Sequence, residues 1–151
     1  MNSIKLFEQS NILGAILANI INLSTIFIFL ARLAQRPQIE NWLGIVFLLS
    51  IFPLGYLLYT AYFLKRPFIY FIWIELMILF VIVEFILDYA LNLDFRNIQW
   101  IVIPYVMLFF GSTGGMIGVA GQAGKKWTII TVISFVIMAI LAFAQRHITG
   151  M

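Results

Sequence analysis

The chain has no cysteine and one histidine among 151 residues. Without cysteine there is no disulfide, no thiol redox chemistry and no thiolate ligand for zinc or an iron–sulfur cluster. The histidine, His147, stands near the C-terminus, where we expect it to be solvated. One imidazole excludes bis-histidine haem ligation and histidine-rich zinc or di-iron sites. We therefore expect no metal site and no cofactor.

Charged residues are also scarce, at 10% of the chain. No basic run exceeds two residues, as at Lys65-Arg66 and Lys125-Lys126. A groove that follows a phosphate backbone needs more, so nucleic acid is excluded as a partner. The segment Gly111-Ser112-Thr113-Gly114 lacks the spacing of a serine nucleophile elbow. These absences make a binding or structural protein a better expectation than an enzyme.

What the sequence has in abundance is apolar residues: 64% are hydrophobic and 17% aromatic, and the mean hydropathy is +1.07. These values lie far outside the usage of soluble domains. A membrane-spanning helix needs about 20 residues, so the chain has room for five or six crossings and little else. We expect a multi-pass protein of the cell membrane, with the lipid bilayer as its first partner. The composition and the short connections are typical of compact bacterial membrane proteins, which implies nothing about function.

Five apolar segments of spanning length are separated by short polar connections. Pro37 disfavours helical conformation at Arg36, so residues 32–41 are predicted to form a loop. Pro53 and Gly55 predict a bend inside the second helix. The expected fold is an all-α bundle forming one domain over residues 1–151. Its helices are predicted at about 11–34, 42–64, 68–91, 98–120 and 127–145.

Five crossings place the two termini on opposite sides of the membrane. The N-terminal side receives five basic residues: Lys5, Lys65, Arg66, Lys125 and Lys126. The other side receives four: Arg32, Arg36, Arg96 and Arg146. Because basic residues are retained in the cytoplasm, this difference of one charge favours a cytoplasmic N-terminus.

Three acidic residues, Glu75, Glu84 and Asp88, lie inside the third apolar segment. A carboxylate at the centre of a bilayer costs about 3 kcal/mol on insertion scales, so it usually faces a protein interior, a partner or a water-filled path. At about 100° per residue, Glu84 and Asp88 share one helix face and Glu75 lies on the opposite face. With acids on both faces, the third helix is predicted to be the central element of the bundle.

The acids allow more than one interpretation. Glu84 is either a group that binds a proton or cation, or a hydrogen-bonded group that fixes helix packing. For Asp88, near the helix end, solvation or pairing with Arg96 is favoured. Glu75 needs a partner from another helix. The polar side chains deep enough to serve are Asn19, Asn22, Tyr56, Tyr59 and Tyr105.

Small residues mark two further helix faces. In the fourth segment Gly111 with Gly115, and Gly114 with Gly118, form small-xxx-small pairs that predict a packing seam, within the chain or against a second copy. The alternative is a locally unwound segment that binds a substrate or ion. In the first segment one face carries residues that predict a protein-facing side: Asn11, Ala15, Ala18, Asn22 and Thr25.

These features support three functions, and no motif identifies a known family. The first is a small membrane protein that binds or transports a small cation, a proton or a hydrophobic ligand. Its cavity would be bordered by the first, third and fourth helices, with Glu84 and Glu75 as charged groups. The second is a non-catalytic structural or accessory subunit that docks to another membrane protein or to a second copy. The third is an enzyme acting on lipid.

Overall fold

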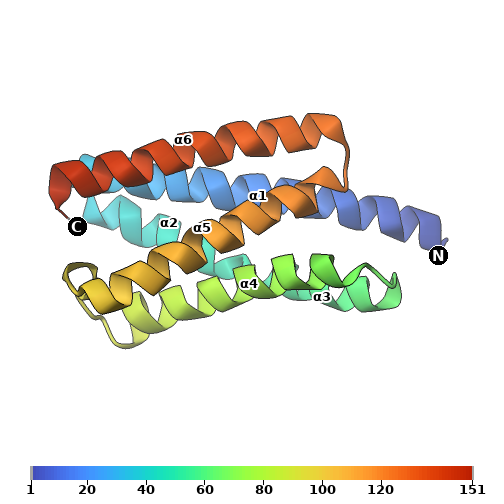
Figure 1. The fold of residues 1–151 in the computed structure, drawn as a ribbon, viewed down its shortest axis with the longest axis horizontal. Coiled ribbons are helices and arrows are strands. Elements are labelled where there is room, and N and C mark those ends of the chain that lie inside the picture. Colours follow the sequence, from blue (N-terminus) through green and yellow to red (C-terminus); the bar gives the residue numbers. More distant parts are fainter. Residues whose placement is uncertain (1, 151) are drawn as a thin grey trace.

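The computed structural model describes residues 2–150, which form helices and no strand. The elements are α1 (Ser3–Leu33), α2 (Pro37–Leu49), α3 (Ile51–Phe63), α4 (Phe68–Glu84), the π-helix η1 (Phe85–Ala90), the 3-10 helix η2 (Phe95–Asn97), α5 (Gln99–Gly121) and α6 (Lys125–Thr149). Figure 1 shows an elongated bundle in which the long helices run along its length.

The all-helical class is confirmed for this part of the chain. Five helical stretches within it are long and apolar enough to cross a membrane: Ser3–Leu33, Pro37–Phe63, Phe68–Ala90, Gln99–Gly121 and Lys125–Thr149. The third and fourth predicted helices agree closely with α4–η1 and α5, whereas α6 extends beyond the predicted range at both ends.

The first helix begins at Ser3, well before the predicted start at residue 11. Its early turns are held by Arg66 from the α3–α4 connection. The Arg66 guanidinium donates to Ser10 Oγ at 2.7 Å and to Asn11 Oδ1 at 2.5 Å, and it lies 3.7 Å from the centre of the Phe7 ring. Burial lowers the pKa of Arg66. This long-range clamp explains why the helix extends through a segment of mixed polarity.

The loop predicted over residues 32–41 is wrong in its second half, because α2 begins at Pro37. Proline suits the first position of a helix, where its missing N–H is not needed. The predicted bend is present: α2 and α3 are separated at Ser50. Pro53 accounts for this break because its ring clashes with the carbonyl group four residues earlier and it cannot donate a hydrogen bond.

The centre of the bundle is α1, so the prediction of a central third helix is wrong. Contacts link α1 to α6, α2, α5 and α3, and 61% of its most apolar stretch is buried, against 28% for the stretch that contains α4. The predicted small-residue face of α1 is buried along its whole length, with Ala15 and Ala18 fully inaccessible. Small side chains there let neighbouring helices approach α1 closely.

Candidate functional site

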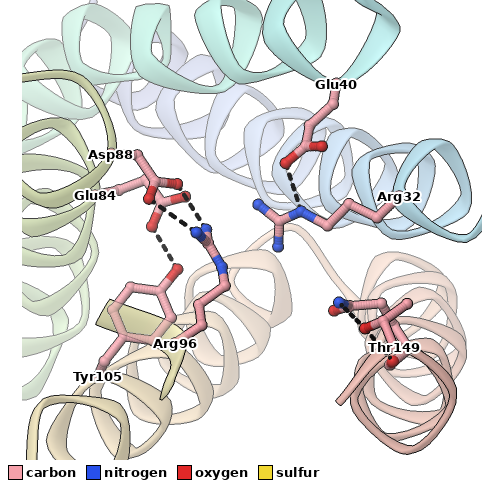
Figure 2. Close-up of polar contacts among 8 residues, drawn as sticks. Arg32, Glu40, Glu84, Asp88, Arg96, Tyr105 and Thr149 are labelled. Carbon is pink, nitrogen blue, oxygen red and sulfur yellow. Dashed lines mark hydrogen bonds and ion pairs between the residues drawn. The ribbon is translucent and has the colours of Figure 1, made fainter. Parts of the chain in front are cut away.

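A cluster of charged side chains lies at the end of the bundle where α1 ends and α5 begins. Figure 2 shows these side chains converging from several elements on a common space. The cluster consists of Arg32, Glu40, Glu84, Asp88, Arg96 and Tyr105. Arg32 comes from the last turn of α1 and Glu40 from the first turn of α2. A cation at a helix C-terminus and an anion at an N-terminus are both favoured by the helix dipoles.

Glu84 is the last residue of α4, directly before the π-helix η1. The hydroxyl of Tyr105 donates a hydrogen bond to Glu84 Oε2. The other carboxylate oxygen, Oε1, makes no hydrogen bond within residues 2–150. In η1 the backbone hydrogen bonds join residues five apart instead of four, as in the bond of 2.9 Å from Leu91 N–H to the Ile86 carbonyl. Short π-helical turns of this kind occur often at functional sites.

The two arginines of the cluster are paired with acids other than Glu84. Arg96 binds Asp88 through two parallel bonds, Nη1 to Oδ1 at 3.1 Å and Nη2 to Oδ2 at 2.7 Å. Burial alone would lower the pKa of Arg96, but the hydrogen bonds and the charge of Asp88 outweigh it and raise that pKa. Arg32 Nε donates to Glu40 Oε1 at 2.5 Å. Pairing of Asp88 with Arg96 was one of the sequence-based alternatives, and it is confirmed.

Two cavities meet at Glu84. An inner cavity of about 110 Å³ is rich in aromatic side chains, which are Phe29, Phe47, Phe80, Phe95, Tyr105, Phe109, Phe110 and Phe143. An outer cavity of about 670 Å³ at the same end of the bundle is lined largely by polar and charged groups. Glu84, Arg32, Arg96 and Ile28 line both. Since each arginine has its own acid, Glu84 is the acid without a directly bonded cation at the boundary between an apolar and a polar compartment.

The asparagines predicted near the acids serve another purpose. Asn19 donates to Thr131 Oγ1 at 2.8 Å, and Asn22 donates to Ser134 Oγ at 2.9 Å. All four side chains are buried between α1 and α6. Their hydrogen bonds join α1 to α6, and all four side chains lie outside both cavities.

Three other predicted residues, Glu75, Tyr56 and Tyr59, are exposed on the outer surface of α4 and α3. None of their side-chain polar atoms has a hydrogen bond within the described part of the chain. The partner of Glu75 that the sequence leads us to expect is therefore not among residues 2–150. Conversely, Arg32 and Glu40 belong to the cluster, but the site predicted from the sequence does not include them. Both lie beside a loop, and nothing in the sequence indicates that their side chains turn toward the interior of the bundle.

The predicted glycine seam is present in part. A Cβ atom on Gly118 would lie 2.6 Å from ring atoms of Trp73 on α4, and one on Gly115 would lie 3.0 Å from the same side chain. Gly111 and Gly114 would meet nothing within 4 Å. The glycines therefore accommodate a tryptophan within the chain. The alternative of an unwound segment is wrong, because α5 is continuous from Gln99 to Gly121.

Within residues 2–150, no group of three or more histidine, aspartate or glutamate side chains could hold a metal ion. Comparisons with protein-family models, with curated proteins and with solved structures give no match.

Proposed function

We propose that the protein is a multi-pass protein of the cell membrane that binds a small hydrophobic cation at Glu84. Its five long apolar helices support insertion in a bilayer. Trp42 and Trp100, which are 71% and 90% exposed near the starts of α2 and α5, suit the headgroup level. With the N-terminus in the cytoplasm, the Glu84 cavities lie toward the external side.

The observation that carries the proposal is the position of Glu84, between an aromatic inner cavity and a polar outer one, without a bonded cation. Aromatic faces attract organic cations, and a nearby carboxylate adds direct charge pairing. An ammonium group would sit at Glu84 Oε1 while its apolar body fills the inner cavity. Either a bound cation or a proton neutralises this carboxylate.

Binding of benzyltrimethylammonium to the purified protein in lipid nanodiscs tests the proposal. Neopentylbenzene, the neutral molecule of the same shape, is the matched ligand control. Two opposite unit charges about 5 Å apart attract by about 3 kcal/mol at an effective dielectric constant of about 20, and desolvation offsets part of this, so Glu84→Gln should weaken binding of the cation roughly 10- to 100-fold. Its effect on the neutral molecule should be small. Glu8→Gln, at the other end of α1, should leave both affinities unchanged.

A second variant tests whether the ligand occupies the inner cavity. Ala142 lines the inner cavity and does not line the outer one. Ala142→Leu should fill part of the inner space and weaken binding with the Glu84 carboxylate still present. Equal affinity for the cation and its neutral counterpart, or a Glu84→Gln variant that binds like the natural protein, would refute the proposed role of Glu84.

The second candidate function is that of a structural or accessory subunit. One observation favours it: Glu75, a carboxylate within a spanning helix, is exposed and has no partner in the described chain. A subunit with this role should lose its assembly, and not a ligand, when its intramembrane acids are replaced.

A further inference from the structure

The outward face of α4 carries a regular stripe of exposed side chains. Its members recur at intervals of three, four and seven residues, continue into η1 and comprise Phe68, Glu75, Leu79, Ile82 and Ile86. This spacing places the five side chains on one face of the helix. No other element of the described chain covers the stripe, since all five of its members are exposed.

Glu75 lies within this stripe at membrane depth. It is seven residues beyond the start of α4 at Phe68, which places it about 10 Å along the helix axis. A spanning segment of about 30 Å puts that position inside the hydrocarbon region. A carboxylate exposed to lipid tails there would be costly, so a group from outside the described chain should satisfy it.

The neighbouring helix α3 presents hydrogen-bond donors at the same depth. Tyr56 lies seven residues before the end of α3 at Phe63, and the short connection makes α3 and α4 antiparallel neighbours. Tyr56 and Tyr59 are 48% and 63% exposed, and their hydroxyl groups have no hydrogen bond within residues 2–150. The exposed sides of α4 and α3 thus carry an acceptor, Glu75, and two donors, Tyr56 and Tyr59.

We propose that a second copy of this chain covers the outer face of α3 and α4 in a two-fold dimer. A two-fold axis brings the same patch of both subunits together, so the patch must be complementary to itself. A surface with an acid and two tyrosines meets this condition, since Glu75 of each subunit accepts from a tyrosine of the other. The proposal does not depend on ligand binding at Glu84, which occupies the opposite face of the helix.

The absence of cysteine makes disulfide mapping direct. Single cysteines are introduced at Leu79, Ile82 and Ile86 on the stripe, and at Ile133 and Ile140 on the exposed face of α6 as matched controls. The purified protein in liposomes is oxidised and examined on a non-reducing gel. Disulfides require Cβ atoms about 4 Å apart, so a two-fold interface should give dimers at one or more stripe positions and none on α6.

Energy transfer between labelled copies in liposomes tests the polar contacts. Intramembrane hydrogen bonds contribute about 0.6–2 kcal/mol each, and a two-fold dimer contains this contact twice, so Glu75→Leu should weaken dimerisation roughly 10- to 1000-fold. Tyr56→Phe combined with Tyr59→Phe should weaken it similarly. Because Glu75 bonds to these tyrosines in the proposed dimer, Glu75→Leu should weaken dimerisation much less in the tyrosine double variant than in the natural protein. A folded protein that stays monomeric at all protein-to-lipid ratios would overturn the proposal.

Two further outcomes would also overturn it. Equal crosslinking on α6 and on the stripe would indicate random collision. A crosslinked product of a different size in native membranes, together with a monomer after purification, would assign this face to a different protein with a cation or donor for Glu75.

Discussion

Trp73 of α4 lies across Gly115 and Gly118 of α5, and alanine at position 118 measures how tightly these helices are packed. The new Cβ atom would lie 2.6 Å from Cη2 and Cζ2 of the indole and 2.7 Å from Cζ3. Carbon atoms in contact prefer about 3.5–4.0 Å, so the ring or the helix must move by about 1 Å. Overpacking of this kind costs about 1–3 kcal/mol.

The same substitution at Gly114 is a matched control, because a Cβ atom there meets nothing within 4 Å. Both positions lie inside α5 and gain about the same helix propensity, up to about 1 kcal/mol, when glycine becomes alanine. The difference between the two variants therefore isolates the clash. We expect the free energy of unfolding of G118A to be about 1–3 kcal/mol below that of G114A, measured by denaturant titration in micelles.

A double-mutant cycle with Trp73→Phe tests whether the indole ring causes the loss of stability in G118A. The smaller ring lacks part of the indole that the new methyl group would meet, so the cost of Gly118→Ala should fall below about 1 kcal/mol in the W73F background. Equal stabilities of G118A and G114A, within about 0.5 kcal/mol, would show that α4 and α5 are not packed as described.

Three further predictions concern two other contacts and the orientation of the protein in the membrane. Thr131→Val removes the hydroxyl that accepts from Asn19, so we expect it to lower the free energy of unfolding by about 1 kcal/mol in the same micelle titration. Arg96→Lys keeps the charge but loses the parallel bonds to Asp88, and a loss of about 1–2 kcal/mol should appear in that titration. With a cytoplasmic N-terminus, a single cysteine at Gln122 should react with an impermeant thiol reagent only from the cytoplasmic side.

Each of these has its own control. Thr128→Val, whose exposed hydroxyl bonds only to the carbonyl of Gly124 just before its own helix, should change stability by less than about 0.5 kcal/mol. Arg36→Lys alters an exposed residue whose side chain makes no hydrogen bond or ion pair within residues 2–150, and it should be neutral. A cysteine at Asn92, at the opposite end of the bundle, should be labelled only from the external side. The reverse labelling pattern would invert the proposed orientation.

The helical segments could be predicted from sequence because each needs only a local run of apolar residues. The start of α1 could not, since it depends on Arg66, which binds Asn11 from 55 positions away. The central position of α1 had a visible signal in Ala15 and Ala18, which are small enough for close helix contact. The acids on both faces of the third helix favour a different centre, because a carboxylate is costly on a side that faces lipid.

Of the eight residues that the sequence predicts for the site, the structure brings together three, Glu84, Asp88 and Tyr105. Helical spacing placed Glu84 beside Asp88, and the charge that follows in the chain suggested Arg96. The bond from Tyr105 to Glu84 joins residues 21 positions apart on different helices. The inner cavity is also lined by residues from several helices, and a local sequence pattern does not predict which helix faces contact one another.

Glu75 and Glu84 lie on opposite faces of one helix, and the two faces have different surroundings. Glu84 accepts a hydrogen bond from Tyr105 inside the chain, whereas Glu75 faces outward. The expectation that a helix with acids on both faces lies centrally is wrong for the single chain, yet it holds for the proposed dimer, in which α4 is covered on both sides. Glu75→Leu should then separate the subunits and leave benzyltrimethylammonium affinity unchanged. A parallel loss of affinity would mean that the dimer contact on α4 also positions Glu84.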